Sequence, residues 1–304
     1  MSAPMQGDAA IVVSDLVKDF GGTGLLGASL TIPDRGVTAI IGPNGAGKTT
    51  FFTIVTGLVR PDSGTVAIAP TVGALAYCPD TPVFERWLTA SEVLDQSASL
   101  ARRRSSASNA ELLARCGLGE VGSRHVGGFS RGMTQRLGIA STLVTDPRLM
   151  ILDEPTSALD PVGRREVLAL LAELGTERGV ILSSHSLADV EKIADTVIIL
   201  AKGRVVFQGA LDALLRQQER PVWRIRTHGR AADLAPILAE NPNTVHSEAR
   251  STSETVVQMR TMADGERDLP RMLAESGIPI VEMVLDRPDL DDAFAAIVAE
   301  KSPR

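Results

Sequence analysis

A glycine-rich segment near the start of the chain constrains the fold more than any other feature. It fits the pattern of a glycine, any four residues, and then Gly-Lys followed by Ser or Thr: Gly42-Pro43-Asn44-Gly45-Ala46-Gly47-Lys48-Thr49. Residues 37–41 before it predict a short buried strand, and residues 49–55 after it predict the first turns of a helix. Glycines can adopt left-handed backbone angles, so the amide groups of such a loop turn inward and form an anion site at the helix N-terminus. The segment therefore predicts a loop that binds the phosphate groups of a nucleotide.

The residues that close this segment predict how a nucleoside triphosphate and Mg²⁺ are held. Lys48 is expected to place its charge between the β- and γ-phosphates, Thr49 to offer its hydroxyl to Mg²⁺, and Thr50 to donate on the α-phosphate side. A glycine-rich turn with an exposed lysine is the alternative interpretation. The flanking strand and helix favour the phosphate loop.

Composition narrows the class of protein. The chain has 304 residues, of which 44% are hydrophobic, and this predicts about two domains that each bury a core. No stretch approaches the roughly 18 to 20 apolar residues of a membrane span, and residues 1–10 lack the basic start and apolar run of a secretion signal. The net charge of -6 argues against broad binding to nucleic acid. Cys78 and Cys116 lack metal-ligand or redox spacing, so we expect reduced thiols in a cytosolic protein.

A second glycine pattern precedes the phosphate loop and argues against a different nucleotide fold. Residues 22–27 match the dinucleotide-binding pattern G-x-G-x-x-G, and they lie between predicted strands at residues 11–20 and 29–32. The pattern runs into a strand-like stretch that ends at Pro33, whereas a dinucleotide site requires a helix there. A Rossmann fold is therefore rejected. Phe20, just before this turn, is either an adenine-stacking residue or part of the core.

In the middle of the chain, the sequence pattern changes from alternating strands and helices to helices alone. A strand is expected at residues 65–68, and residues 84–143 show helical patterns without a convincing strand. Thr89-Ala90-Ser91-Glu92 is a capping box that opens a helix through Leu100, and a further helix is expected at residues 109–115. We therefore predict a helical subdomain at about residues 84–143.

Two later apolar runs carry polar residues at their ends. Residues 149–152 end in Asp153-Glu154, and residues 180–182 lead to His185. Buried parallel strands would bring these residues and the phosphate loop to the same edge of a sheet, where ligands bind in such folds. Asp153 is then the candidate Mg²⁺ ligand and Glu154 the candidate base that activates water. A strand-end turn and a buried histidine are the alternatives for each feature alone, and the set together favours a site.

The remainder of the chain predicts a hairpin and a second domain. Residues 196–200 and 204–207 form the expected hairpin, which closes a first domain at residues 1–215. In residues 216–304 the expected order is that of a ferredoxin-like α+β fold, followed by an amphipathic final helix from Asp289. Strands are predicted near residues 223, 245, 256–259 and 280–285, and helices near residues 234 and 273. This domain shows no catalytic constellation, and regulation, dimerisation or partner contact are its open roles.

With these residues in view, residues 11–215 resemble the ATP-binding subunit of an ABC transporter. Residues 42–49 are similar to Walker A, residues 149–154 to Walker B and residues 157–160 to the D-loop. The resemblance implies that Asp160 belongs to the nucleotide site, that His185 is the switch histidine and that Phe20 stacks on adenine. The expected fold is an α/β P-loop ATPase core with an inserted helical subdomain.

The signature segment of that family is similar to residues 129–135. The resemblance implies that Ser130 and Gly132 contact the γ-phosphate of a nucleotide held by the opposite subunit. Arg131 and Met133 depart from the usual L-S-G-G-Q sequence in the way of the branch that drives ABC-2-type exporters, which include drug-resistance pumps. The tail at residues 287–294 also resembles a segment found in that branch.

One residue departs from the family pattern at a functional position. Asp80 lies where the family usually has the Q-loop glutamine. A third carboxylate near Asp153 and Glu154 would affect Mg²⁺ if it reaches the site, and a surface turn is the alternative. Asp80 is therefore a candidate metal residue with an open role.

The resemblance implies a motor that binds ATP and Mg²⁺. The expected partners are separate transmembrane permease subunits and a second ATPase chain, either identical or related, and no nucleic acid is expected. The protein is then cytoplasmic and peripheral on the inner face of the cell membrane.

A soluble ABC-type ATPase of translation or DNA repair is the main alternative, but such proteins usually carry two phosphate loops, a zinc insert or a long coiled coil. A GTPase would need an Asn-Lys-x-Asp motif, which the chain lacks.

Overall fold

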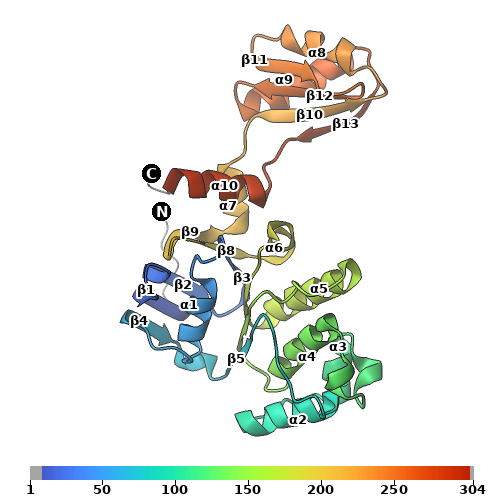
Figure 1. Cartoon of the computed structure of the whole chain (residues 1–304). Helices are drawn as coiled ribbons and strands as arrows, with labels where there is room; N and C mark the ends of the chain where they lie inside the picture. The colour runs from blue at the N-terminus through green and yellow to red at the C-terminus, as the bar shows by residue number, and fades with distance from the viewer. Residues whose placement is uncertain (1–8, 302–304) are drawn as a thin grey trace. The chain divides into compact units, whose positions relative to one another are not determined.

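The computed structural model describes residues 9–301, which divide into two compact units (Figure 1). The first unit contains the chain up to Asp212 and returns from Phe294 onward, and the second is Ala213–Ala293. The predicted domain boundary at residue 215 lies close to this division, and the independence of the two domains stays a prediction. The expectation that residues 1–10 carry no secretion signal falls mostly on residues outside the described part.

A six-stranded sheet forms the centre of the first unit. Its order is β5-β6-β7-β3-β8-β9; neighbours from β5 to β8 run parallel, and β9 pairs antiparallel with β8. The bounds are β5 (Leu75–Cys78), β6 (Leu149–Leu152), β7 (Gly179–Ser183), β3 (Gly36–Ile41), β8 (Thr196–Ala201) and β9 (Arg204–Ala210). The predicted parallel strands and hairpin are thus confirmed, whereas β5 was not predicted.

A separate antiparallel sheet of order β2-β1-β4 completes the β structure of this unit. It consists of β1 (Ala9–Asp19), β2 (Gly24–Pro33) and β4 (Ser63–Ile68). Because β2 begins at Gly24, four of the six residues of the dinucleotide-like pattern lie inside a strand, which supports the rejection of a Rossmann fold. Helix α1 (Lys48–Val55) buries Phe51 and Phe52 fully in a core shared with residues of both sheets. The helix that follows the phosphate loop is therefore anchored in the main core.

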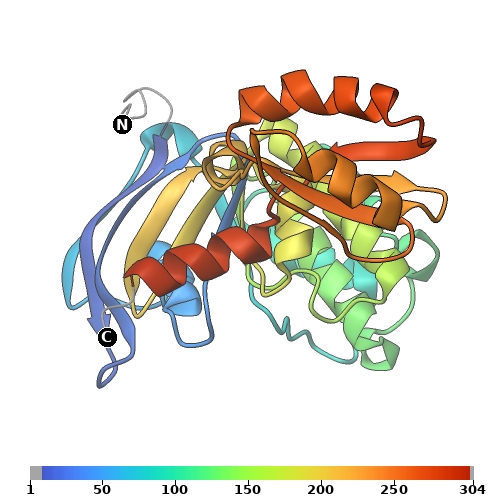
Figure 2. The same cartoon turned by 90° about the horizontal axis from the view of Figure 1, so that it is seen from above.

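Helices replace strands between residues 84 and 143, all of which the structure describes. The main ones are α2 (Ala90–Ala101), α3 (Asn109–Arg115) and α4 (Arg131–Leu143). Thr89 and Ser108 each begin their helix with a capping box, because the hydroxyl accepts from the third residue of the helix, whose glutamate accepts from the cap. Figures 1 and 2 both show these helices grouped on the side of the unit opposite the antiparallel sheet. Helices thus occupy the region where the sequence predicted them, and their description as a separate subdomain stays a prediction.

Helix α5 (Pro161–Glu177) covers part of the central sheet, and α6 (Leu187–Ile193) and α7 (Leu211–Gln217) follow later in the chain. Near its end α5 carries Gly175, where a Cβ atom would lie 2.7 Å from Cγ2 of Val37 in β3. That separation is too short for two carbon atoms, so glycine permits the helix to pack this closely on the sheet.

The second unit is a four-stranded antiparallel sheet of order β11-β12-β10-β13. Its elements are β10 (Val222–Thr227), α8 (Ala231–Ala239), β11 (Thr244–Ala249), β12 (Glu254–Met259), α9 (Met262–Glu275) and β13 (Ile280–Leu285). This order is the predicted ferredoxin-like arrangement. Side chains alternate along β10, so that Trp223 and Ile225 are buried against the helices while Arg224 and Arg226 are exposed.

The final helix, α10 (Leu290–Lys301), has the predicted apolar face. Leu290, Ala293 and Ile297 are buried, and Phe294 and Val298 are half-buried. Residues three and four apart share a helix face, so this spacing places all five on one stripe. The helix therefore packs against the rest of the protein, as its sequence predicted.

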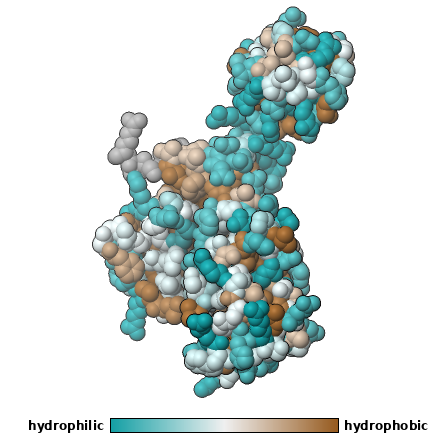
Figure 3. Space-filling model, turned by 45° about the vertical axis from the view of Figure 1, so that its right-hand side comes forward, coloured by the Kyte–Doolittle hydropathy of each residue, from teal (hydrophilic) through white to brown (hydrophobic). Residues whose placement is uncertain are grey.

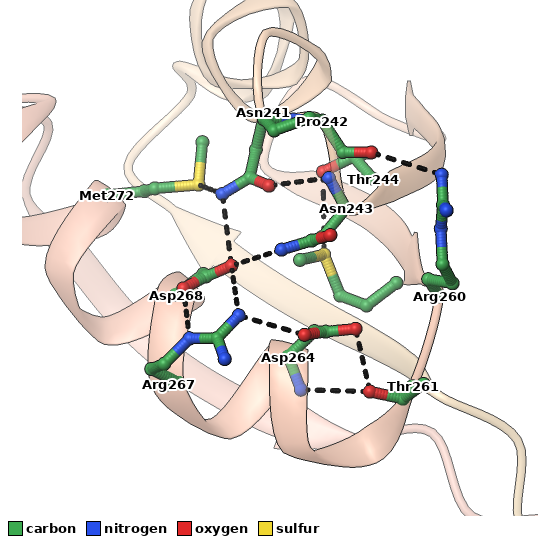
Figure 4. A network of polar contacts seen from close by, with 11 residues as sticks. Asn241, Pro242, Asn243, Thr244, Arg260, Thr261, Asp264, Arg267, Asp268 and Met272 are labelled. Carbon is green, nitrogen blue, oxygen red and sulfur yellow. Dashed lines mark hydrogen bonds and ion pairs between the residues drawn. The ribbon is translucent and has the colours of Figure 1, made fainter.

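A polar network fixes the loop after α8 to helix α9 (Figure 4). At its centre the buried carboxylate of Asp268 accepts from the amide of Asn243 at 3.0 Å, from the amide of Asn241 at 3.4 Å and from Nε of Arg267 at 2.9 Å. The same guanidinium donates to Asp264 at 2.8 Å. These hydrogen bonds favour the ionised carboxylate and lower the pKa of Asp268 well below its ordinary value.

The lowered pKa predicts an acid-sensitive contribution to stability. Because the folded pKa is below the unfolded one, ionised Asp268 stabilises the fold above its unfolded pKa of about 3.9, and this contribution disappears as the pH falls toward the folded value. Replacing Asp268 by Asn should therefore destabilise the second unit at neutral pH, with a difference from the wild type that shrinks in acid. Thermal unfolding is followed by fluorescence of Trp223, made the sole tryptophan by Trp87→Phe.

A matched control separates this network from carboxylate loss in general. Asp233 pairs with Nε of Arg230 at 2.9 Å on the exposed surface of the same unit, where ion pairs contribute about 0 to 1 kcal/mol. Asp233→Asn should shift the unfolding temperature little at any pH. A difference between Asp268→Asn and the wild type that stays constant with pH would contradict the prediction.

Candidate functional site

The phosphate loop connects β3 to α1 and has the backbone geometry that its glycines permit. Gly45 and Gly47 have φ angles of 79° and 104°, in the left-handed region. At Gly42 a Cβ atom would lie 2.2 Å from the carbonyl oxygen of Leu200, so the loop approaches β8 too closely for any side chain. Lys48, the first residue of α1, donates from Nζ to the carbonyl oxygen of Gly42 at 2.8 Å. The lysine side chain therefore lies across the loop with which it is predicted to bind phosphate.

A cavity of about 300 Å³ lies in front of this loop. It collects most of the residues that the sequence predicted for the nucleotide site, from four segments of the first unit. Those lining it are Asn44, Gly45, Ala46, Gly47, Lys48, Thr49 and Thr50 from the loop, together with Phe20, Asp80, Asp153 and Glu154. Gly42 and Pro43 begin the loop but do not line the cavity, and neither does His185, which is hydrogen-bonded to the lining residue Glu154.

Asp153 follows β6 and is almost completely buried. One carboxylate oxygen accepts from the Thr49 hydroxyl at 2.9 Å, and the other accepts from the Ser183 hydroxyl at the end of β7. Two of the three predicted Mg²⁺ residues, Thr49 and Asp153, are thus already in contact. A hydroxyl and a carboxylate oxygen side by side are the hard oxygen donors that Mg²⁺ prefers, usually with phosphate and water completing the shell.

Glu154 adopts an unusual backbone conformation beside the same serine. Its φ angle is 48°, and its N–H donates to the Ser183 hydroxyl at 2.9 Å. Oε2 lies 2.7 Å from Nδ1 of His185 and also accepts from the His185 backbone N–H at 3.3 Å. Left-handed residues other than glycine are strained and are often found at functional sites. The turn places a carboxylate in the cavity with a histidine bonded to it.

The electrostatics of the site depend on Lys48 and the two carboxylates. Burial lowers the pKa of Lys48, while the negative charges of Glu154 and Asp153 oppose that shift and favour the ammonium form. The cavity is therefore lined by the positively charged side chain of Lys48 and by the acidic side chains of Asp153 and Glu154. This charge arrangement suits a ligand with several phosphate groups and a divalent cation.

Asp80 and Phe20 reach the same cavity from its rim. Asp80 is exposed, lines the cavity and accepts from the Ser157 hydroxyl at 3.0 Å. Phe20 is 58% exposed, and Nζ of Lys18 lies 5.4 Å from its ring centroid. An exposed ring at the mouth of the cavity is available for stacking, whereas a core residue would be covered.

Ser130, Gly132 and Asp160 line a different hollow of about 560 Å³. Ser130 begins α4 by accepting from the Met133 N–H at 3.2 Å, and Asp160 begins α5 by accepting from the Gly163 N–H at 2.8 Å. The two hollows share none of their lining residues. The structure thus brings one predicted group together around the phosphate loop and a second group elsewhere.

Ser183 is a site residue that sequence reasoning missed. Its hydroxyl donates to Asp153 and accepts from the N–H of Glu154, so it joins the two acidic residues. The available signal was its position at the end of a parallel strand, next to the strand that leads into Asp153. A single serine carries no spacing pattern of its own.

The family model described as ABC transporter matches residues 25–157. An uncharacterized ABC transporter ATP-binding protein, YxlF of Bacillus subtilis, is 33% identical over 277 residues, which cover 89% of this chain and 92% of that protein. The daunorubicin/doxorubicin resistance ATP-binding protein DrrA of Streptomyces peucetius is 33% identical over 314 residues, covering 95% and 92%. A solved ATP-binding subunit of an ABC transporter shares 32% identity and a TM-score of 0.59, over 68% of this chain and 92% of that one.

Proposed function

Because this chain belongs to the family of ABC transporter ATP-binding proteins, which hydrolyse ATP to power transport, we propose that it is the motor of an exporter. In this proposal ATP binding and hydrolysis in a dimer move separate membrane-spanning subunits. The relative DrrA, named for resistance to daunorubicin and doxorubicin, supports export over import. The observation that carries the proposal is the convergence of Lys48, Asp153 and Glu154 on one cavity at the edge of a parallel sheet.

The chain's own groups divide the work of hydrolysis. The loop amides and Lys48 bind the phosphates, because a helix N-terminus and a lysine both favour negative charge. Glu154 accepts a proton from the attacking water, and its hydrogen bond to His185 holds the carboxylate in place. Thr49 and Asp153 fit a bound Mg²⁺, which would neutralise phosphate charge. Asp80 is a further candidate near that ion.

The separation of the two hollows supports a site shared between two chains. Members of this family bind ATP and dimerise. Here the hollow with Ser130 and Gly132 shares no lining residue with the cavity of the phosphate loop. In the proposed dimer each nucleotide lies between the loop of one chain and Ser130, Gly132 and Asp160 of the other, either a second copy or a related chain.

Mixing two inactive variants tests the shared site. Lys48→Ala and Ser130→Arg are each expected to lack ATPase activity. In a mixed dimer the loop of the Ser130→Arg chain faces the intact Ser130 of the Lys48→Ala chain, so one site is complete and activity should return. The measurement is steady-state phosphate release at several mixing ratios. If mixed dimers form, as shown by differently tagged chains, and no activity returns, the site is not shared.

The surface next to Asp80 is the proposed contact with the membrane-spanning partner. Val83 is 87% exposed and Trp87 is 70% exposed, just before helix α2. Aromatic side chains of this kind often dominate protein interfaces. On the face drawn in Figure 3, hydrophobic residues lie in several groups between polar ones, as on most protein surfaces. Among the described residues, no helix combines the length and apolar character needed to cross a bilayer.

Fractionation tests this contact. The chain expressed alone should remain in the supernatant, and co-expression with its membrane-spanning subunit should move it to the membrane fraction. Trp87→Ala should reduce that recruitment, whereas Leu58→Ala, at a residue that is 67% exposed elsewhere in the first unit, should not. Membrane association without the partner subunit would contradict the proposal.

A further inference from the structure

Asp189 is a buried carboxylate that the proposed chemistry does not use. It lies on α6, and its side chain is 5% exposed. Oδ2 accepts from the Thr156 hydroxyl at 3.3 Å and lies 3.5 Å from Nε of Arg164. Burying a charge is costly unless it is paired and hydrogen-bonded. Thr156 supplies the hydrogen bond, and Arg164 supplies the opposite charge at ion-pair distance, without a hydrogen bond from Nε.

The partners of Asp189 belong to segments that carry different functional residues. Thr156 follows Glu154 by two residues. Arg164 lies in the first turn of α5, and its N–H donates at 2.8 Å to the carbonyl oxygen of Asp160, which caps that helix. Asp189 itself follows His185 by four residues. One carboxylate therefore joins the segments that bear Glu154, Asp160 and His185.

Helix α5 is also tied to the helix that Ser130 begins. Nη2 of Arg136 in α4 lies 2.8 Å from Oε2 of Glu166 in α5, and Nη1 of Arg136 donates to the carbonyl oxygen of Cys116 at 3.2 Å. The first turns of α5 are consequently paired with α4 through Glu166 and with α6 through Arg164. A displacement of α6 would be transmitted through Asp189 to the residues beside Asp160.

We propose that Asp189 is a positioning residue that holds two parts of the chain in place: the part that acts on the chain's own nucleotide and the part that acts on the nucleotide of the partner chain. Through Thr156 and α6 it holds the segments of Glu154 and His185, which act on the chain's own nucleotide. Through Arg164 it holds the segment of Asp160, which acts on the partner's nucleotide. This inference rests on the proposed function, in which each nucleotide lies between two chains.

The isosteric change Asp189→Asn should separate catalysis from binding. Asparagine keeps an oxygen that can accept from Thr156 but loses the charge that faces Arg164. Since the phosphate loop is untouched, KM for ATP should stay near the wild-type value, while kcat should fall by about 2-fold to 30-fold, the range observed for residues that couple sites. A general loss of structure would instead lower the unfolding temperature and the active fraction.

The decisive experiment places Asp189→Asn in one chain of the mixed dimer made from Lys48→Ala and Ser130→Arg. The single complete site takes Glu154 and His185 from the Ser130→Arg chain and Asp160 from the Lys48→Ala chain. If Asp189 positions both the segments of Glu154 and His185 and the segment of Asp160, the substitution should reduce turnover whichever chain carries it. A residue that only supports His185 would matter in the first chain alone, and one that only supports Asp160 would matter in the second alone.

Controls make each outcome decisive. Asp146 pairs with Nη1 of Arg178 at 3.2 Å, at the other end of α5, and Asp146→Asn should leave turnover unchanged in both chains. If Asp189→Asn folds poorly, Arg164→Gln replaces it as the test variant. Arg164 is partly exposed, and its substitution removes the same ion pair, so turnover should fall in the same way. Sensitivity in only one chain, or in neither, would overturn the role of Asp189 and leave the shared site intact. Absence of activity in the parent mixture would overturn the shared site and this inference together.

Discussion

Replacing Glu154 by glutamine is expected to reduce ATP turnover by about 10²-fold to 10⁴-fold, the usual contribution of a general base, while ATP binding is retained. The amide has nearly the shape of the carboxylate and can still bond to His185, but it cannot accept the proton of water. The cavity and the phosphate loop are unchanged by the substitution. Equilibrium binding of ATP and steady-state phosphate release provide the two measurements.

The control for Glu154→Gln is a glutamate away from the cavity. Glu173 pairs with Nη2 of Arg115 at 2.7 Å on the surface of α5, and Glu173→Gln should hydrolyse ATP at the wild-type rate. Near-normal hydrolysis by Glu154→Gln would show that another group activates the water. His185 would then be the next candidate, because it is the only imidazole bonded to this carboxylate in the part of the chain that the structure describes.

Lys48→Ala is expected to remove ATP binding at working concentrations. A hydrogen bond to a charged group contributes about 1.5 to 3 kcal/mol, so each lost phosphate contact should raise Kd by about 10-fold to 10²-fold. The wild-type lysine bonds to the carbonyl oxygen of Gly42, and its loss also frees that oxygen. Titration with a fluorescent ATP analogue measures the change in Kd.

An exposed lysine provides the comparison for this variant. Lys192 lies on α6 outside the cavity, and Lys192→Ala should bind ATP normally. Thermal unfolding without nucleotide checks that Lys48→Ala remains folded. Wild-type affinity in a folded Lys48→Ala protein would mean that the loop amides alone hold the phosphates.

The sequence predicted the residues around the phosphate loop because topology concentrates them. Lys48, Asp153 and His185 each follow a strand of one parallel sheet, and the carboxyl ends of parallel strands share an edge. A local pattern was therefore enough to locate them together. The roles of Ser130 and Asp160 came only from resemblance, because a residue that acts on another chain has no local signal in its own.

The features that escaped prediction depend on contacts between distant segments. Strand β5 has only four residues and precedes a proline, so its apolar pattern is too short to distinguish from a loop. In the antiparallel sheet, β1 pairs with both β2 and β4. The alternation of apolar and polar residues within a strand does not indicate which other strands it pairs with. Asp189 was missed because an acidic residue on a short helix predicts exposure, whereas Thr156 and Arg164 bury it.

The separate cores of the two units have a consequence for ligand-linked stability. A nucleotide that binds only the folded first unit stabilises that unit by about 2.7 kcal/mol at a concentration of 100 times Kd. The second unit has its own core around Trp223 and Leu269 and contributes no residue to the nucleotide cavity. ATP should therefore raise the melting temperature of one part of the chain and leave the transition reported by Trp223 as an internal reference within the same molecule.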